Sequence, residues 1–377
     1  MENLIKRDIY DSIDNNLFKW KIIIIYGPRQ VWKTTIARQF LDKYWDKNSY
    51  YNCDEPDVRD AFTNKTSTEL KNLVWNSKLI IIDEAQRVEN IWITLKLLID
   101  NYPDLKIIAT WSSSFELANK INEPLTWRKY EYHLFPFSIN ELKQIYNNIE
   151  INRILEERLI YWSYPVVFDK SKDEKISDLK MLTDSYLFKD IFSFWKIKKP
   201  DILVKLLQAL ALQIWNQVSY NELSKLIWID KNTVESYISL LEQAFIIFRL
   251  NSFSRNLRTE LKHSKKIYFY DNGIRNALIN NFNETNLRLD TWHLWENFLL
   301  SERIKYISNK SLYRNSYFWR NHLQAEIDYI EEYNWELHTF EFKYWNKKQK
   351  IPKAFNETYP NSEYTIINKE NYLDFLT

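Results

Sequence analysis

The first third of the chain contains three short, almost continuously apolar runs. Ile22–Tyr26, Leu79–Ile82 and Leu105–Ala109 have the length and residue types of strands buried on both faces, and a helical stretch, Ile36–Tyr44, follows the first run. Strands that alternate with helices predict an α/β fold with a parallel sheet. Because no apolar run approaches the roughly 18 residues of a membrane-spanning helix, we expect no membrane anchor.

Between residues 202 and 250 the pattern changes to short amphipathic helices. Ser219 and Glu222 have the spacing of a capping box, Trp228 lies in a turn, and Asp230 is placed to cap a second helix that runs to Gln243. The strand-like segment Phe245–Leu250 completes a winged-helix pattern.

This winged-helix region has two possible roles. If it binds DNA, its second helix would present four residues to the major groove: Lys231, Asn232, Thr233 and Ser236. The helix itself has few basic residues, and the cluster follows it: Arg249, Arg255, Arg258, Lys262, Lys265 and Lys266. The alternative is therefore an interdomain or partner-binding module.

Two alternating runs flank Asn334-Trp335 near the end of the chain. If these two residues form a two-residue hairpin loop, Tyr333 pairs with Glu336. Asp328 then faces Glu341, and Glu326 faces Lys343 on the same side. The opposite, apolar face would hold Ile327, Tyr329, Phe340 and Phe342.

Glycine and tryptophan are the abnormal features of the composition. The 377 residues include 2 Gly and 16 Trp, whereas an average protein has about 7% glycine. Several tryptophans stand where turn chemistry favours glycine, among them Trp162, Trp228, Trp335 and Trp345. We therefore hypothesise that the gene's UGA codons encode glycine and appear here as tryptophan. The alternative is a truly tryptophan-rich surface.

The charge balance and the cysteine content say little about partners or function. The 52 basic and 50 acidic residues nearly cancel, so net charge predicts no particular partner. The single cysteine, Cys53, cannot close an intrachain disulfide. Without a signal-peptide pattern, the expected location is a reducing cytoplasm.

A phosphate-binding pattern follows the first apolar run. Its residues are Gly27, Pro28, Arg29, Gln30, Val31, Trp32, Lys33, Thr34 and Thr35. With glycine at position 32, this is G-x-x-x-x-G-K-T between a strand and a helix. Backbone amides would cradle the phosphates of ATP, Lys33 would reach the β- and γ-phosphates, and Thr34 would ligate Mg²⁺. An indole at position 32 would obstruct the backbone's approach.

The second and third apolar runs end in polar residues. Asp83 would hold Mg²⁺ with Thr34, and Glu84 would orient and polarise the attacking water. In the run Thr110–Ser114, Ser112 is a candidate sensor of the γ-phosphate. Arg128 is a candidate charge stabiliser, acting within its own chain or across an interface, or else a surface arginine.

These motifs resemble the bacterial and archaeal AAA-type ATPases that carry a C-terminal domain of unknown function. The similarity extends from the P-loop through Ser163-Tyr164-Pro165 and Lys266–Leu278 to Leu294–Arg303. The resemblance implies ATP binding and hydrolysis without specifying a cellular role. In that family the positions of Trp32, Trp111 and Trp127 are glycines.

The C-terminal hairpin resembles the D…E-x-K core of the restriction-endonuclease-like fold. This resemblance implies a divalent metal held by Asp328 and Glu341, assisted by Lys343, with Glu296 as a further ligand. A solvated hairpin face with a Glu326–Lys343 pair would give the same pattern.

The expected organisation is an ATPase domain (1–150), a helical connector (151–200), the winged-helix region (201–260) and an endonuclease-like domain (261–377). Three functions fit it: an ATP-hydrolysing switch acting on C-terminal modules, a nucleotide-gated nuclease, or a non-catalytic nucleotide- or nucleic-acid-binding regulator, favoured if Trp32 is genuine. DNA, RNA, a protein partner and self-association all remain open.

Overall fold

The computed structural model describes residues 5–44, 47–113, 125–161, 163–187, 200–255, 265–345 and 349–377. The contacts divide the chain into two compact units, one of residues 1–135 and 243–245, the other of residues 136–242 and 246–377. Each is described by itself. Ser114, Trp162, Arg258 and Lys262, named above, lie outside the described residues.

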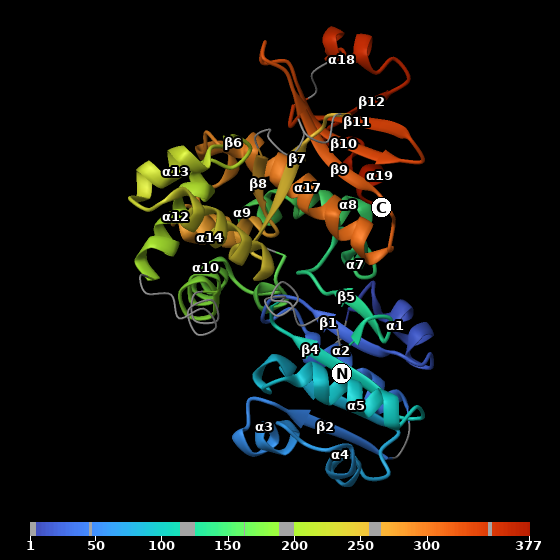
Figure 1. Cartoon of the computed structure of the whole chain (residues 1–377). Helices are drawn as coiled ribbons and strands as arrows, with labels where there is room; N and C mark the ends of the chain where they lie inside the picture. Colours follow the sequence, from blue (N-terminus) through green and yellow to red (C-terminus); the bar gives the residue numbers. More distant parts are fainter. Residues whose placement is uncertain are drawn as a thin grey trace. The chain divides into compact units, whose positions relative to one another are not determined.

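The first unit is an α/β layer structure, drawn in blue to cyan-green in Figure 1. Its strands are β1 (Ile22–Tyr26), β2 (Asn48–Asn52), β3 (Leu79–Asp83), β4 (Lys106–Trp111) and β5 (Lys129–His133). They form one parallel sheet in the order β2-β3-β4-β1-β5. All residues of β1 and β3 are buried, as expected for strands covered on both faces.

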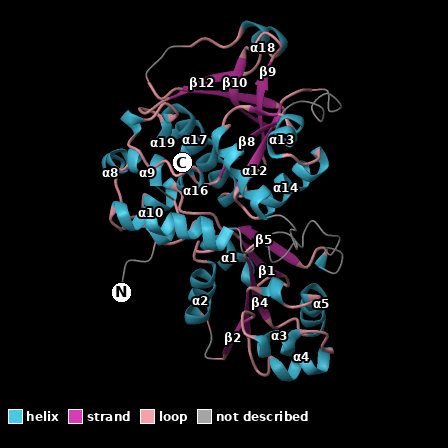
Figure 2. Ribbon diagram, turned by 90° about the vertical axis from the view of Figure 1, so that its left-hand side faces the viewer, coloured by secondary structure: helices cyan, strands magenta, loops and turns pink. Residues whose placement is uncertain are grey.

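Helices cover both faces of this sheet. They are α1 (Tyr10–Leu17), α2 (Lys33–Lys43), α3 (Pro56–Phe62), α4 (Ser67–Leu73) and α5 (Ile91–Asn101), with a 3₁₀ turn at Ala85–Arg87. Figure 2 shows α2 on one side of the sheet and α5 on the other. The α2 helix buries Ile36, Ala37 and Phe40, whose spacing places them on one face.

The second unit begins with helices. These are α7 (Ile139–Leu142), α8 (Asn148–Arg153), α9 (Leu155–Tyr161), α10 (Lys172–Met181) and α12 (Pro200–Leu212), with a 3₁₀ turn at Pro165–Val167 and a π-helical turn at Leu182–Leu187. Next come β6 (Gln217–Val218), α13 (Tyr220–Ile227), α14 (Lys231–Gln243), β7 (Ile247–Ser252) and β8 (Lys265–Phe269). No helix in the described part of the chain is long and apolar enough to cross a membrane.

The segment from α12 to β8 has the helix and strand order expected from its sequence pattern. Asp230 caps α14 by accepting the amide of Thr233 at 2.9 Å, and Trp228 ends α13 in a left-handed conformation. The strand β8, which sequence reasoning assigned to the last domain, pairs with both β6 and β7. Residues 265–269 therefore share a sheet with this segment, and the winged-helix interpretation stays a prediction.

The remaining elements extend the same sheet. They are α16 (Asn272–Leu278), a 3₁₀ turn at Thr285–Leu287, α17 (Thr291–Asn309), β9 (Asn315–Arg320), β10 (Glu326–Tyr333), β11 (Glu336–Phe342), α18 (Lys353–Thr358), β12 (Glu363–Ile367) and α19 (Tyr372–Leu376). The seven strands run in the order β12-β11-β10-β9-β7-β8-β6. The α17 helix is buried nearly all round, which makes it a core helix.

The hairpin has the predicted register, but one residue lies on an unexpected face. Tyr333 pairs with Glu336 and Tyr329 with Phe340. A register shift between Ile327 and Ile330 breaks the alternation of β10 where it pairs with β9. Ile327 consequently packs with Ile330 in one cluster. Tyr329 stacks on both Phe340 and Phe342, so the predicted apolar face forms without Ile327.

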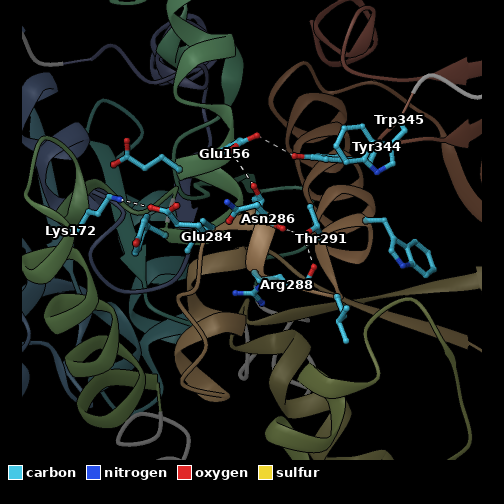
Figure 3. Close-up of a pocket in the computed structure, with 14 residues that line it drawn as sticks. Glu156, Lys172, Glu284, Asn286, Arg288, Thr291, Tyr344 and Trp345 are labelled. Carbon is cyan, nitrogen blue, oxygen red and sulfur yellow. Dashed lines mark hydrogen bonds and ion pairs between the residues drawn. The ribbon is translucent and has the colours of Figure 1, made fainter.

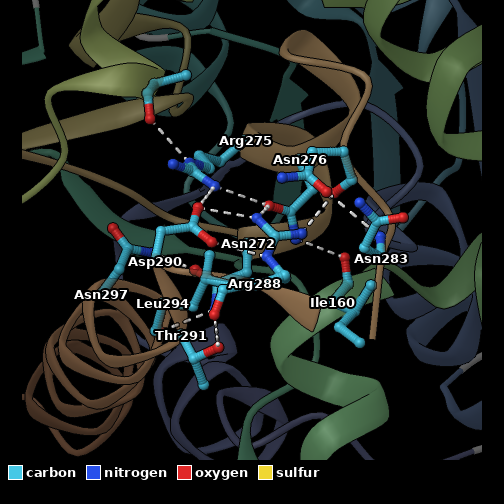
Figure 4. A network of polar contacts seen from close by, with 12 residues as sticks. Ile160, Asn272, Arg275, Asn276, Asn283, Arg288, Asp290, Thr291, Leu294 and Asn297 are labelled. Carbon is cyan, nitrogen blue, oxygen red and sulfur yellow. Dashed lines mark hydrogen bonds and ion pairs between the residues drawn. The ribbon is translucent and has the colours of Figure 1, made fainter. Parts of the chain in front are cut away.

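A buried polar network joins α9, α16 and the start of α17 (Figure 4). Arg275 and Arg288 both donate to Asp290, Arg275 at 2.5 Å and Arg288 at 2.8 and 2.9 Å. The side-chain oxygen of Asn276 accepts from both guanidinium groups, and its amide donates to the carbonyl of Ile160 at 2.8 Å. Buried charges thus have partners, as stability requires.

Candidate functional site

The phosphate loop joins the carboxyl end of β1 to the start of α2. Lys33 is buried, and its Nζ donates to the carbonyl oxygens of Gly27 at 2.9 Å and Pro28 at 2.8 Å. The ammonium group therefore lies over the loop, in the position from which a P-loop lysine reaches phosphate oxygens.

Gly27 is required by a close backbone approach. Leu134 donates its amide to the carbonyl of Tyr26 at 2.7 Å, and a Cβ on Gly27 would lie 2.1 Å from the carbonyl oxygen of Leu134. Any side chain at position 27 would push the backbone that follows β5 away from the loop.

Trp32 has φ 70° and ψ 32°, a left-handed conformation that favours glycine. Four other tryptophans also have positive φ: Trp127, Trp215, Trp228 and Trp335. Three of these five are 85–90% exposed, an unusual position for so large an apolar side chain. These conformations support the glycine interpretation, which stays a hypothesis.

Trp111 differs from these residues. It is fully buried at the end of β4, without a positive φ, and stacks on Trp92 with ring centroids 5.0 Å apart. Its indole nitrogen finds no hydrogen-bond acceptor among the described residues. A buried unpaired donor of this kind costs about 1–3 kcal/mol.

Three hydroxyl groups converge on Asp83. Thr34 donates to its Oδ2 at 2.7 Å and Tyr50 to the same oxygen at 2.6 Å, while Thr110 donates to Oδ1. Thr34 and Asp83 therefore lie side by side at the mouth of the loop, as predicted. A hydroxyl and a carboxylate oxygen in this arrangement fit Mg²⁺.

Glu84 is held by two neighbours. Ser112 donates to its two carboxylate oxygens at 2.6 and 2.5 Å, and Gln86 donates at 2.5 Å. The order of the sheet explains the contact with Ser112, because β4 lies between β1 and β3. Ser112, predicted to sense the γ-phosphate, is thus also a partner of the predicted catalytic carboxylate.

Arg128 lies at the other end of the sheet. Its carbonyl accepts the amide of Ile22, the first residue of β1, whereas the phosphate loop follows the last residue of that strand. Its guanidinium pairs with Asp100 at 2.7 Å. Five strand residues separate the two ends by about 13 Å, so the Arg128 guanidinium does not lie at the phosphate loop of its own chain.

Sequence reasoning missed Arg7 and Tyr50. Arg7 is buried and donates to the carbonyls of Val31 and Phe135, each at 2.5 Å, so it fixes the phosphate loop from behind. Arg38 stacks over the ring of Tyr50, whose hydroxyl contacts Asp83. No local signal identifies either residue, since each contact joins distant parts of the chain.

The C-terminal candidate residues gather in the second unit. The amide of Phe342 donates to Asp328 at 2.8 Å, and the charge of Asp328 contributes to the raised pKa of Glu341. Lys343 pairs with Glu341 at 2.6 Å, and Glu326 pairs with Lys266 and Arg320. The expected Glu326–Lys343 pair is therefore not formed among the described residues.

Glu296 enters the same region from α17. It is buried, and its Oε1 accepts from the hydroxyl of Tyr268 at 2.6 Å and lies 3.3 Å from Nζ of Lys266. Burial raises the pKa of Glu296 to about 7, against the opposing charge of Lys266. Burial also raises the pKa of Glu341 to about 7, and the charge of Asp328 adds to that shift.

These four acidic residues, Glu296, Glu326, Asp328 and Glu341, are called the carboxylate cluster below. Across the described residues, no group of three or more His, Cys, Asp and Glu side chains is arranged to hold a metal ion. The expected nuclease metal site is therefore not preformed in this part of the chain.

The exposed face of α14 is nearly neutral. Lys231, Asn232 and Ser236 are exposed as predicted, but so is Glu235, and the hydroxyl of Thr233 is bonded to Asp230. Of the basic residues that follow, Arg249 pairs with Glu242 at 2.7 Å and Lys266 is buried. DNA contact stays a prediction.

A separate cavity of about 630 Å³ opens beside α9 and the start of α17 (Figure 3). Several of its polar side chains pair with one another: Lys172 with Glu284 at 3.1 Å, and Glu156 with Thr285 at 3.1 Å. None of the predicted site residues lines it.

Comparison with known families agrees with this geometry. Residues 19–143 match the AAA domain family. Residues 152–285 match a domain of unknown function (DUF8612), and residues 293–375 match another (DUF4143).

Two similar proteins each carry the name "Uncharacterized protein". One from Mycobacterium tuberculosis is 23% identical over 352 residues, covering 90% of this chain and 74% of that protein. One from Methanocaldococcus jannaschii is 25% identical over 289 residues, covering 71% of this chain and 64% of that protein.

Solved structures give only distant similarity. The RuvB Holliday junction branch migration motor of Thermotoga maritima is 15% identical, with 70% of this chain and 95% of that chain covered at a TM-score of 0.30. A Drosophila ORC structure with Cdc6 and DNA is 11% identical, with coverages of 72% and 90% at a TM-score of 0.26. Residues 19–143 therefore combine a match to the AAA domain family with a phosphate loop on a parallel α/β sheet, and two regions that match families of unknown function follow.

Proposed function

We propose that this chain is a Mg²⁺-dependent ATPase whose hydrolytic cycle acts as a switch on its C-terminal modules. The observation that carries the proposal is the convergence of Lys33, Thr34, Asp83 and Glu84 at the carboxyl ends of β1 and β3. In this proposal, the native residue at position 32 is glycine.

The residues divide the work as follows. Lys33, already turned over the loop, neutralises phosphate charge, and the amides at the start of α2 bind the phosphate oxygens. Thr34 and Asp83 would hold Mg²⁺, which supplies charge stabilisation on the β- and γ-phosphates. Tyr50 and Thr110 fix the Asp83 carboxylate through their hydroxyls.

Glu84 orients the attacking water and polarises it. Its carboxylate already accepts from Ser112 and Gln86, so a water molecule would take a remaining lone pair or replace one of these donors. The two donors keep the side chain at the end of β3, near the phosphate loop. Such positioning is where most of the catalytic advantage in phosphoryl transfer arises.

The test measures ATP binding and turnover in the Trp32→Gly chain. Lys33→Ala should abolish binding, and Glu84→Gln should keep binding while lowering turnover by about 10²-fold or more. Glu89→Gln, the same substitution at an exposed position five residues away, is the matched control. Turnover that survives Glu84→Gln at the control's level would refute the assigned role.

A non-catalytic regulator is the outcome if position 32 is truly tryptophan. In the chain as printed, Trp32 has a left-handed backbone conformation and places an indole next to Lys33, which favours this second candidate. Titration of the printed chain and of its Trp32→Gly variant with an ATP analogue separates the two candidate functions. Equal and weak binding by both proteins would support the regulator without hydrolysis.

A further inference from the structure

Lys266 lies close to three members of the carboxylate cluster, Glu296, Glu326 and Asp328. The fourth member, Glu341, pairs with Lys343. Lys266 comes from β8, whereas Glu296 comes from α17, Glu326 and Asp328 from β10, and Glu341 from the neighbouring strand β11. The α17 helix contacts β8 in the second unit, where Figure 1 shows both in orange. Four elements therefore deliver acidic or basic groups to one buried region.

The ammonium group of Lys266 is enclosed by this cluster. The side chain is 1% exposed, its Nζ lies 3.3 Å from Oε1 of Glu296, and it also pairs with Glu326. Tyr268 donates to the same oxygen of Glu296 at 2.6 Å. Burial alone would lower the pKa of Lys266, but Glu296, Glu326 and Asp328 together raise it above its ordinary value. These three acids therefore stabilise the charged form of Lys266.

Lys343, the lysine of the E-x-K pattern, is in a different environment. It pairs with Glu341 at 2.6 Å and its side chain is 24% exposed. Water can therefore compensate its charge, whereas Lys266 depends on the carboxylates. This difference makes Lys343 a matched comparison for Lys266.

The cluster does not fit a catalytic divalent cation. Such an ion needs several oxygen ligands converging at about 2.0–2.6 Å, and no such group is found among the described residues. A metal bound by Glu296 would also face the charge of an ammonium group 3.3 Å from that carboxylate.

We propose that the Lys266 ammonium is the built-in counter-cation of the carboxylate cluster, so that this domain keeps the acidic pattern of a metal nuclease without a metal-dependent active site. Through its pairs with Glu296 and Glu326, Lys266 then joins β8 and α17 to the C-terminal hairpin. This inference goes beyond the proposed ATPase, whose site is in the other unit.

The first test uses electron paramagnetic resonance to measure Mn²⁺ binding to the full chain without nucleotide. The chain as printed is compared with Asp328→Asn and Glu341→Gln, and any Mn²⁺ at the phosphate loop is common to all three. Equal binding is expected. A bound ion lost in both variants would overturn the proposal, as would Mn²⁺-dependent DNA cleavage lost in Asp328→Asn.

The second test is a double-mutant cycle followed by thermal unfolding. Lys266→Met should lower the melting temperature more than Lys343→Met does, because it leaves buried carboxylates without a counter-charge. The loss should shrink in a Glu296→Gln background, where one of those charges is absent. An equal loss in both backgrounds would overturn the counter-cation role, independently of any ATPase result.

Discussion

Five tryptophans have a left-handed backbone conformation, and one of them, Trp32, lies in the phosphate loop. Trp32 begins α2 at φ 70°, and Trp228 ends α13 at φ 59°. A left-handed conformation costs a residue with a Cβ about 1–2 kcal/mol. At position 228 that cost affects only stability, but at position 32 it falls on the loop that must enclose phosphate.

Trp32→Gly should raise affinity for ATP and its analogues by about tenfold or more, because relief of 1–2 kcal/mol corresponds to roughly that factor. Calorimetric titration with a non-hydrolysable analogue measures it. Trp228→Gly is the matched control: it has the same backbone conformation but is 90% exposed, so it should stabilise the fold and leave affinity unchanged. Equal affinities for Trp32→Gly and the printed chain would contradict the prediction.

At the scale of elements, two features hold the second unit together: the hairpin β10–β11 and the network before α17. Asn334 and Trp335 have φ 52° and 67°, the pair of positive angles found in a type I′ turn. Asp290 receives hydrogen bonds from Arg275 and Arg288. The hairpin depends on backbone conformation, and the network on charge.

Trp335→Gly should stabilise the protein by about 1 kcal/mol, because glycine adopts this turn without strain. The change is measured as a shift in the urea midpoint. Trp75→Gly provides the comparison, since Trp75 is also exposed but has no positive φ. It should give no gain, and a similar gain at both positions would argue against a conformational cause.

Asp290→Asn tests the network through pH. Burial alone would raise the pKa of Asp290, but Arg288 and Arg275 lower it from 3.8 to about 2. Its stabilising effect is therefore fully present above pH 3.8 and is lost as the pH falls through about 2.

Asp290→Asn should accordingly cost about 2 kcal/mol or more at pH 7, and the difference from the unmutated chain should narrow between pH 4 and pH 2. Urea unfolding across this range measures it. Asp201→Asn, an exposed position on α12, should show no such dependence. A constant cost for Asp290→Asn at every pH would show that the charge pairing is not its source.

At the scale of the whole molecule, the position of Arg128 bears on assembly. It lies at the end of the parallel sheet opposite its own phosphate loop and pairs with Asp100. If Arg128 stabilises charge during hydrolysis, it does so in the site of a second copy.

In the Trp32→Gly background, Arg128→Ala should then lower turnover about tenfold or more while leaving ATP affinity unchanged, and specific activity should rise with protein concentration. Mixing Arg128→Ala with Lys33→Ala should restore turnover. The Arg128→Ala subunit keeps an intact phosphate loop, and the Lys33→Ala subunit supplies Arg128 to it. Arg87→Ala removes another partly exposed, ion-paired arginine as the control. Failure of the mixture to regain activity would leave Arg128 as a surface residue.

The sequence by itself determined the features that depend on neighbouring residues. The apolar runs predicted β1, β3 and β4, the loop at Gly27–Lys33 predicted the match of residues 19–143 to the AAA domain family, and Asn334-Trp335 predicted the hairpin register. Strand burial, turn chemistry and phosphate binding are each encoded within a few residues.

Only the tertiary structure decided which distant groups meet. It brought Arg7 behind the phosphate loop, Ser112 to Glu84, and Lys266 into the carboxylate cluster. It also placed Arg128 at the far end of the sheet. Such contacts follow from strand order and helix packing, which local pattern does not encode, because the free energy of burying and pairing these charges depends on partners far away in the chain.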